Sequence, residues 1–128
     1  MADHVLIGGT DAHAKNYSVL LAGSRAQVAP LYDVATAAAY DFDTPATAAM
    51  KVGDHWSLRE INDFDWAKVG RRLGLDADAA VARVHDLRQR LPDSFGQAVG
   101  DVPESLRERA SAIAHAVEQR LTGGPGRR

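Results

Sequence analysis

An Asp followed five residues later by an Asn, with a second Asp beyond two short apolar runs, constrains this chain most. Asp11 and Asn16 have that spacing, and Asp33 follows seventeen residues after Asn16. In phosphoryl-transfer loops of this spacing the first Asp accepts a hydroxyl proton, while the Asn and a downstream Asp hold the metal ions. The D-x-x-x-x-N pattern alone occurs by chance in many surface loops. Its weight here comes from the order loop, strand, turn, strand, Asp.

The segment between Asn16 and Asp33 predicts a β-hairpin. Residues 17–22 contain Tyr, Val and Leu in a partly alternating pattern, which favours a strand. Residues 23–25 (GSR) form a turn signal, and residues 27–29 (QVA) are expected to return as the second strand, stopped by Pro30. Such a hairpin would bring the Asn and the second Asp to the same end.

Two segments carry a resemblance to a known family. Residues 11–18 (DAHAKNYS) and 30–34 (PLYDV) resemble the C-terminal part of HipA-type toxin kinases, bacterial serine/threonine kinases with a protein-kinase-like fold. The resemblance continues weakly through residues 50–52 and 58–61 and covers almost the whole chain. It implies an α+β, mostly helical fold: a C-lobe with a β-hairpin next to the catalytic loop, over residues 1–122, followed by a disordered tail over 123–128.

The motif and the resemblance together suggest roles for six residues. Asp11 is expected to be the catalytic base, and Asn16 and Asp33 are expected to bind Mg²⁺, which prefers hard oxygen ligands. The resemblance places five side chains against the nucleotide: His13, Lys15, Asn16, Tyr32 and Asp33.

Each of these residues also has an ordinary structural interpretation. Asp11, Asn16 and Asp33 could form turns or cap backbone amides, since Asp and Asn commonly do so in loops. His13 could brace the loop through backbone hydrogen bonds, and Lys15 could be an ordinary surface lysine. Tyr32 could pack on the hairpin rather than contact a nucleotide. Tyr-Asp-Val stands where protein kinases have Asp-Phe-Gly, so a Phe-flip switch does not transfer.

The resemblance further implies ATP with Mg²⁺ as the phosphoryl donor, transfer to a protein hydroxyl, a HipB-like DNA-binding antitoxin as partner and an aminoacyl-tRNA synthetase as target. A kinase also needs a Gly-rich loop and a strand lysine that hold the phosphates. Only Gly8-Gly9 and residues 123–126 are Gly-rich, and neither fits that role. We therefore expect a truncated kinase half, a fragment or a natural short product, with little turnover alone. The alternative is a non-catalytic remnant that binds an antitoxin or a complementary lobe.

Length and composition limit the class of protein and the kinds of site that this chain can contain. The length of 128 residues suits one domain, and a net charge of −2 gives no electrostatic case for direct binding of nucleic acid. The sequence has no transmembrane run or signal peptide and no cysteine, which fits a cytoplasmic protein. The remaining histidines are scattered singly and the serines lack a G-x-S-x-G context, so zinc and hydrolase sites find no support.

The rest of the chain predicts mostly helices. Residues 2–8 are too short to judge by periodicity, and the resemblance suggests that they are the last turns of a helix. Residues 34–48 are expected to form a short helix followed by a loop. Residues 49–52 suggest a strand, and Ser57 with Glu60 resembles a capping box that opens a short helix. Trp56 and Trp66 are expected to pack in the core.

Three longer helices are expected towards the C-terminal end. The first covers residues 65–73 and ends at Gly74, because Gly favours the left-handed conformation after a helix. Asp76 is expected to cap the second, which Pro92 should stop, leaving a short helical piece over residues 93–99. Pro103 lies in the first turn of the last helix, which Gly123 ends.

Overall fold

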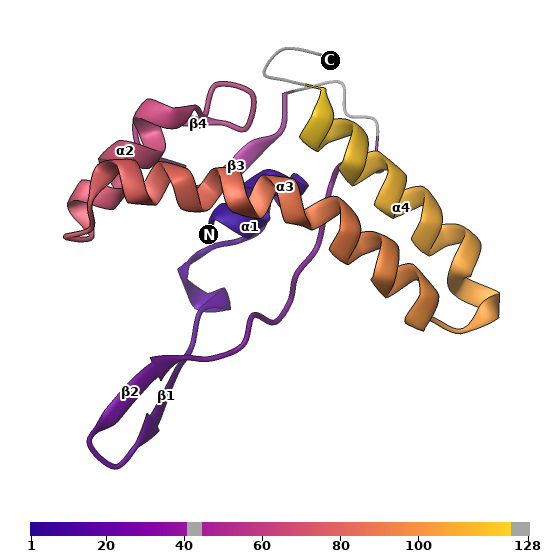
Figure 1. The fold of residues 1–128 in the computed structure, drawn as a ribbon, viewed down its shortest axis with the longest axis horizontal. Helices are drawn as coiled ribbons and strands as arrows, with labels where there is room; N and C mark the ends of the chain where they lie inside the picture. Colours follow the sequence, from indigo (N-terminus) through magenta and orange to yellow (C-terminus); the bar gives the residue numbers. More distant parts are fainter. Residues whose placement is uncertain (41–44, 124–128) are drawn as a thin grey trace.

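The computed structural model describes residues 1–40 and 45–123 and shows an α+β fold in which helices dominate, as predicted (Figure 1). These residues form four α-helices, one 3-10 turn and two separate antiparallel β-hairpins, joined by loops. In chain order the elements are α1 (Ala2–Ile7), η1 (Ala14–Asn16), β1 (Val19–Ala22), β2 (Arg25–Val28), β3 (Thr47–Val52), β4 (His55–Ser57), α2 (Asp63–Arg72), α3 (Ala77–Asp101) and α4 (Glu104–Thr122).

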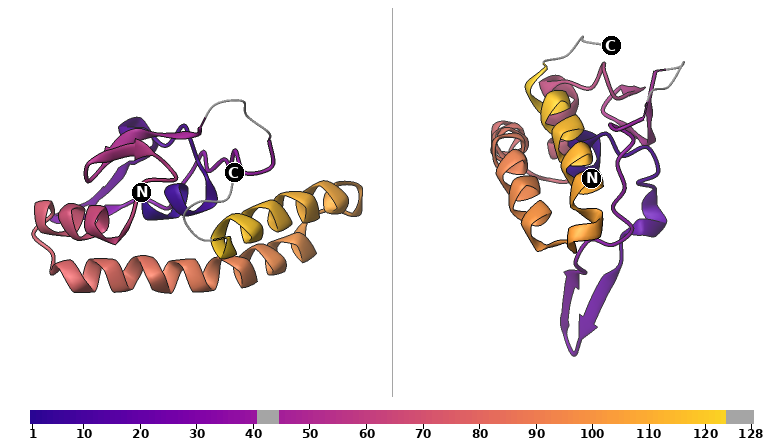
Figure 2. Two further views of the ribbon diagram at one scale, coloured as in Figure 1. Left: turned by 90° about the horizontal axis from the view of Figure 1, so that it is seen from above. Right: turned by 90° about the vertical axis from the view of Figure 1, so that its right-hand side faces the viewer.

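The short helix α1 lies at the centre of the core. Figures 1 and 2 show the long helix α3 running along one side of it, with α4 folded back beside the second half of α3. Strand β3 lies near α1 as well, and α2 packs against the first half of α3. The core side chains come from all these elements: Val5, Leu6, Ile7, Ala48, Val52, Leu58, Ile61, Trp66, Val84, Val117 and Leu121. Because α1 is buried among them, the loop that leaves its end starts from a fixed point.

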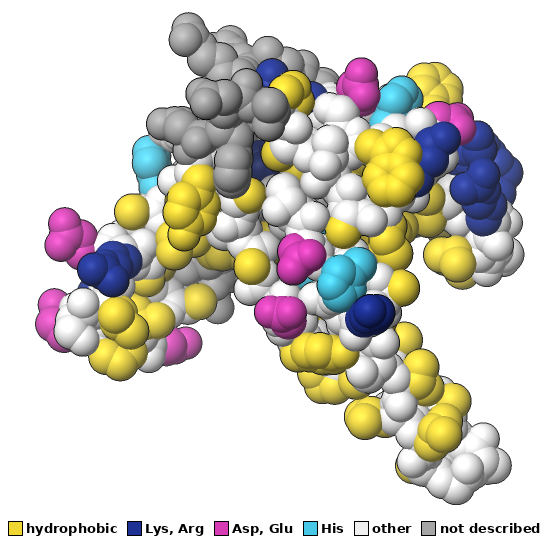
Figure 3. Space-filling model, turned by 180° about the vertical axis from the view of Figure 1, so that it is seen from behind, with side chains coloured by type: hydrophobic (Ala, Val, Ile, Leu, Met, Phe, Trp, Pro, Cys, Tyr) yellow, Lys and Arg dark blue, Asp and Glu magenta, His cyan; other side chains and the backbone are white. Residues whose placement is uncertain are grey.

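The hairpin predicted between Asn16 and Asp33 is present, and it projects away from this core (Figure 1). Val19 pairs with Val28, and Ala22 pairs with Arg25 across the Gly23-Ser24 turn. All eight strand residues are exposed, and the projecting arm carries many hydrophobic side chains on the face shown in Figure 3. An isolated two-stranded hairpin is marginally stable in water. This arm is therefore the least supported part of the fold.

The helix predicted after residue 34 is not formed over residues 34–40, and residues 41–44 lie outside the described part of the chain. Residues 34–40 form only a local turn, in which the Tyr40 amide donates to the Ala37 carbonyl at 3.0 Å, and other groups in this segment bond to the C-terminal end of α1 and to Gly8. The Ala37 amide donates to the Gly8 carbonyl at 3.0 Å, and the Thr36 hydroxyl donates to the Ile7 carbonyl. These hydrogen bonds between distant segments of the chain take the place of the hydrogen bonds that a local helix would form.

The capping box predicted at Ser57 is also wrong, because Ser57 ends strand β4 and only a turn follows it. The capping box is formed instead by Asn62 and Asp65 at the start of α2. The Asn62 side chain accepts from the Phe64 amide, and the Asp65 carboxylate accepts from the Asn62 amide, each at 3.0 Å. Trp66 is buried as predicted, whereas Trp56 is half exposed.

Helix α3 does not stop at Pro92 but continues to Asp101, so that it spans 25 residues in all. Proline removes one backbone donor and crowds the preceding turn, yet α3 packs against both α2 and α4, and this packing outweighs the local cost. The predicted caps at Asp76 and the ends at Gly74 and Gly123 are confirmed. None of the helices in the described residues is long and apolar enough to cross a membrane.

Candidate functional site

The candidate loop begins at the end of α1, where the chain turns sharply. Gly8 has a φ of 82°, a left-handed conformation that costs glycine little, and both Gly8 and Gly9 are buried. The Gly9 amide donates to the His4 carbonyl at 2.6 Å, which closes the helix. The loop carrying Asp11 leaves from this closed end.

A turn of 3-10 helix then orients Asn16. The Asn16 amide donates to the His13 carbonyl at 3.0 Å, and this turn buries the Asn16 side chain, which is 4% exposed. From there the Asn16 side-chain amide donates to the Asp33 carboxylate at 3.2 Å. The structure thus brings together the two predicted metal ligands, seventeen residues apart, beside the base of the hairpin.

Asp33 has an unusual backbone conformation. It is the non-glycine residue of the described chain with a positive φ, at 54°, in a region that Asp tolerates better than most residues. The preceding residue is fixed by its side chain, because the Tyr32 hydroxyl donates to the Lys15 carbonyl at 2.7 Å and lies 3.1 Å from the Ser18 hydroxyl. Tyr32 therefore ties the segment before Asp33 to the 3-10 turn of residues 14–16.

Asp11, His13 and Lys15 form the open side of the site. The Asp11 carboxylate is 84% exposed, and His13 Nε2 lies 3.9 Å from it. Lys15 is exposed as well, and it contributes its carbonyl, rather than its ammonium group, to the contact with Tyr32. The loop therefore presents a carboxylate, an imidazole and an ammonium group to solvent, next to a buried amide.

His4 of α1 contacts Tyr17, which follows the 3-10 turn, and this contact supports the loop between them. The sequence did not indicate this contact. His4 is 2% exposed, its Nδ1 lies 3.3 Å from the Tyr17 hydroxyl, and the two rings meet edge-to-face with centroids 5.9 Å apart. Burial lowers the pKa of His4 and raises that of Tyr17. Both groups are therefore neutral near pH 7. A helical position in an apolar run gave no signal that His4 would face the loop.

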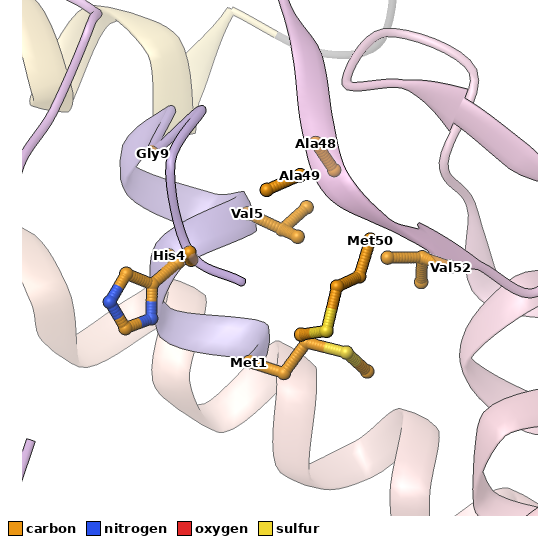
Figure 4. A pocket seen from close by; sticks show the side chains of 9 residues that line it. Met1, His4, Val5, Gly9, Ala48, Ala49, Met50 and Val52 are labelled. Atoms are coloured by element: carbon orange, nitrogen blue, oxygen red, sulfur yellow. The ribbon is translucent and has the colours of Figure 1, made fainter. Parts of the chain in front are cut away.

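A small pocket lies between α1, the loop and β3, and Figure 4 shows the side chains that line it. Its lining includes His4, Val5, Gly9, Ala12 and Met50. About 10 Å³ is open to a water molecule, enough for about one. This pocket is therefore too small to hold a nucleotide.

The donor set at Asn16 and Asp33 fits magnesium. Within residues 1–40 and 45–123, no three His, Asp or Glu side chains cluster as a metal-binding group, so a site built from protein ligands alone is not formed there. Mg²⁺ usually takes one or two protein oxygens and completes its shell with water and phosphate oxygens. In such a partial set the Asn16 amide oxygen and the Asp33 carboxylate would be the protein ligands; here the Asn16 amide nitrogen donates to that carboxylate.

Comparison with known proteins identifies the family. The model of the HipA-like C-terminal domain matches residues 1–95. The chain belongs to this family. HipA relatives include the serine/threonine-protein kinase toxin HipA of Shewanella oneidensis, 27% identical over 118 residues that cover 92% of this chain and 27% of the toxin. A putative kinase, Y4mE of Sinorhizobium fredii, is 31% identical over 105 residues, covering 82% of this chain and 24% of that protein.

The fold agrees with the HipA assignment. A solved complex of HipA, HipB and operator DNA from Shewanella oneidensis contains a chain that matches with a TM-score of 0.76 and 22% identity. The match covers 94% of this chain and 29% of that one. The chain thus spans about a quarter of the length of the curated HipA relatives it matches. It is a protein related to kinase toxins, and the predicted fold of a HipA C-terminal region is confirmed.

Proposed function

We propose that this chain supplies the catalytic-loop half of a serine/threonine kinase site of the HipA type, which transfers the γ-phosphate of ATP to a protein hydroxyl. The observation that carries the proposal is the hydrogen bond between Asn16 and Asp33 at the base of the hairpin. Turn and cap roles for these residues do not require the two side chains to meet. Metal binding by both of them does.

In this proposal Asp11 is the base. Its exposed carboxylate can reach a substrate held on the open side of the loop, and it accepts the proton of the attacking hydroxyl. The hydroxyl oxygen bonds to the γ-phosphorus as the bond to the β–γ bridging oxygen breaks, and ADP leaves. His13 and Lys15, exposed on the same loop, would face the nucleotide and balance phosphate charge.

Asn16 and Asp33 would hold Mg²⁺, which supplies charge neutralisation at the phosphates. Tyr32 would act from the same side, with its half-exposed ring available to the nucleotide and its hydroxyl fixing the Lys15 carbonyl. The sequence contains no Gly-rich loop and strand lysine that could hold the β- and γ-phosphates. We therefore expect little or no turnover by this chain alone, and these elements to come from outside residues 1–128.

The test is calorimetric titration of the folded chain with ATP and Mg²⁺. We expect saturable binding that is lost in Asn16→Ala and Asp33→Ala and kept in Asp11→Ala, because the proton acceptor is not needed for binding. Asp78→Ala, which removes an exposed carboxylate from the first turn of α3, is the matched control. A folded wild-type chain that binds no Mg²⁺–ATP would contradict a preformed half-site.

The biological setting is proposed by analogy with the relatives. A HipB-like DNA-binding antitoxin as partner and an aminoacyl-tRNA synthetase as target are proposals for this chain, as is a cytoplasmic location. The antitoxin proposal is supported by the solved HipA complex, which contains HipB. A net charge of −2 gives no electrostatic case for direct DNA binding by the chain itself.

A second candidate is a non-catalytic interaction module, and the projecting hairpin favours it. Leu21 is 79% exposed, and Val19 and Val28 are 60% and 67% exposed. Contiguous exposed apolar side chains of this kind commonly mark an interaction site, here for a complementary lobe or an antitoxin. The double variant Leu21→Lys with Val28→Lys should then abolish binding of a purified HipB-type antitoxin, while Phe64→Lys, on α2, should not. Equal antitoxin binding by both variants would exclude the hairpin as the interaction site.

A further inference from the structure

The end of α1 is tied to two distant segments, the segment after Asp33 and the C-terminal helix α4. The last four carbonyls of a helix lack partners within it and must find them elsewhere, especially when they are buried. In α1 these belong to His4, Val5, Leu6 and Ile7, all of them buried. Where their hydrogen bonds go therefore shows what holds the start of the loop.

Two of the four carbonyls are capped by the C-terminal helix. Arg120 of α4 donates from Nε to the Leu6 carbonyl at 3.1 Å and from Nη2 to the Val5 carbonyl at 3.0 Å. A Cβ at Gly8 would lie 3.2 Å from the Arg120 side chain, so the glycine turn and this guanidinium fit closely. A cation at a helix C-terminus also meets the negative end of its peptide dipoles.

A third carbonyl is capped by the segment after Asp33. The Thr36 hydroxyl donates to the Ile7 carbonyl and accepts from the Ala38 amide at 3.0 Å. One residue on, the Ala37 amide donates to the Gly8 carbonyl at 3.0 Å. The fourth carbonyl, that of His4, accepts from Gly9. All four acceptors are thus satisfied, by Arg120, by Thr36 and by the turn itself.

These contacts bear on Asp33 because its positive φ needs support on both sides. A residue in a sparsely populated conformation persists when the surrounding structure fixes it. Before Asp33, the Tyr32 hydroxyl holds the Lys15 carbonyl, and after it, Thr36 holds the Ile7 carbonyl. Arg120 then fixes the helix end to which Thr36 is bonded. The segment carrying Asp33 is therefore anchored to the same helix from which the loop carrying Asn16 departs.

We propose that Thr36 and Arg120 are positioning residues that set Asp33 against Asn16 through the C-terminal end of α1. This assignment rests on the proposed role of Asn16 and Asp33 as the metal-binding pair. Arg120 lies beyond residues 1–95, the part that the family model matches.

The test compares the ¹⁵N–¹H resonances of the Asn16 side-chain amide and the Asp33 backbone amide among variants of the full chain. We expect Thr36→Val and Arg120→Met to shift both resonances and to weaken Mg²⁺–ATP binding about tenfold, as loss of groups that orient metal ligands commonly does. Thr36→Ser, which keeps the hydroxyl, should restore both properties. Two matched controls, Thr122→Val and Arg109→Met, remove a threonine hydroxyl and a guanidinium from other positions on α4. They should change neither the two resonances nor Mg²⁺–ATP binding.

Unshifted resonances in folded Thr36→Val and Arg120→Met would overturn the assignment. If Arg120→Met fails to fold, Thr36→Val decides, since it leaves α4 intact. If Thr36→Val also unfolds while Thr36→Ser does not, Thr36 has a structural role only and the assignment is again overturned. A wild-type chain without nucleotide affinity would contradict the proposed kinase function instead, and the resonance comparison would still decide whether Thr36 and Arg120 position Asp33.

Discussion

The side-chain amide of Asn16 donates to the carboxylate of Asp33 across 3.2 Å, and the two residues differ sharply in exposure. Asn16 is buried in the 3-10 turn, whereas Asp33 is exposed on the opposite side of the hairpin base. One partner is thus fixed by the fold and the other faces solvent. This arrangement suits the metal-binding role proposed for the pair, because such a site is preformed yet accessible to a metal–nucleotide complex.

Asp33→Asn and Asp33→Ala should separate the chemical role of Asp33 from its conformational one. Both remove the carboxylate, so both should abolish Mg²⁺-dependent nucleotide binding in a calorimetric titration. Only Ala is strained at a φ of 54°, so Asp33→Ala should lose about 1 kcal/mol of unfolding free energy relative to Asp33→Asn. Helical content by circular dichroism should stay unchanged in both variants. Loss of helicity in Asp33→Asn would show that the carboxylate is structural.

The sequence sufficed to predict the loop and the hairpin because their signals are local. Asn16 and Asp33 flank two short apolar runs and a Gly-containing turn, and hairpin pairing alone brings their ends together. The same local signals located the cap at Asp76 and the helix end at Gly74.

Other features depend on contacts between distant residues and could not be predicted from the sequence. Arg120 bonds to carbonyls more than a hundred residues away, and nothing in a helical run singles out one arginine from its neighbours. Pro92 is a local stop signal that packing on both sides of α3 overrides. Ser57 and Glu60 match a capping-box pattern, but Ser57 pairs with Thr47 in a β-hairpin and therefore does not cap a helix.

Gly53→Ala should be far more destabilising than Gly23→Ala, although both residues have a positive φ, 56° and 60°. A Cβ at Gly53 would clash with the Asp65 carboxylate and lie 2.5 Å from the Asp65 Cα and Cβ, whereas one at Gly23 would meet nothing within 4 Å. Gly23→Ala should cost about 1 kcal/mol from backbone strain alone, and Gly53→Ala about 3 kcal/mol or more. Urea unfolding of the two variants measures this difference. Equal losses would mean that Asp65 moves freely, contrary to its buried contacts.

Asp65→Ala should lower the free energy of unfolding by about 3 kcal/mol at pH 7, because its carboxylate accepts from three groups. These are the amides of Asp54 and Asn62, at 2.8 and 3.0 Å, and Nδ1 of His55, at 2.9 Å. Burial by itself would raise the pKa of Asp65, but these hydrogen bonds outweigh it and hold the pKa below its ordinary value.

The same contacts fix the pH dependence of this loss. A carboxyl with a depressed pKa in the folded state stabilises the protein above its unfolded pKa of 3.8, and this contribution disappears as the pH falls through the folded value. The difference in stability between wild type and Asp65→Ala should therefore narrow below about pH 4. Asp78→Ala, which removes an exposed carboxylate, is the control and should lose little at any pH. A difference that stays constant down to pH 2 would contradict the ionised form as the stabilising one.

His4 should make stability fall on mild acidification. Burial lowers its pKa below 6.5, the N-terminal ammonium group adds to this, and Asp3 opposes it. The unfolded chain then takes up a proton near pH 6.5 that the folded chain does not, so folding is penalised as the pH falls below that value. Unfolding by urea at pH 7.5 and 5.5 should show a larger loss for wild type than for His4→Gln, with the exposed His115→Gln behaving like wild type. A loss in His4→Gln as large as in wild type would assign the effect to other groups.

Pro92→Ala should stabilise the protein, which is unusual for a substitution within a long helix. Pro92 lies inside α3, where it has no amide to donate to the carbonyl four residues before it and its ring crowds that turn. Alanine supplies the donor and has the highest helix propensity, so the free energy of unfolding should rise by about 1–3 kcal/mol. Pro103→Ala is the matched control, because Pro103 caps α4 and its missing amide costs nothing there. Thermal unfolding followed by circular dichroism measures both. If Pro92→Ala melts no higher than wild type, the packing of α3 against α2 and α4 must depend on the geometry that the proline imposes.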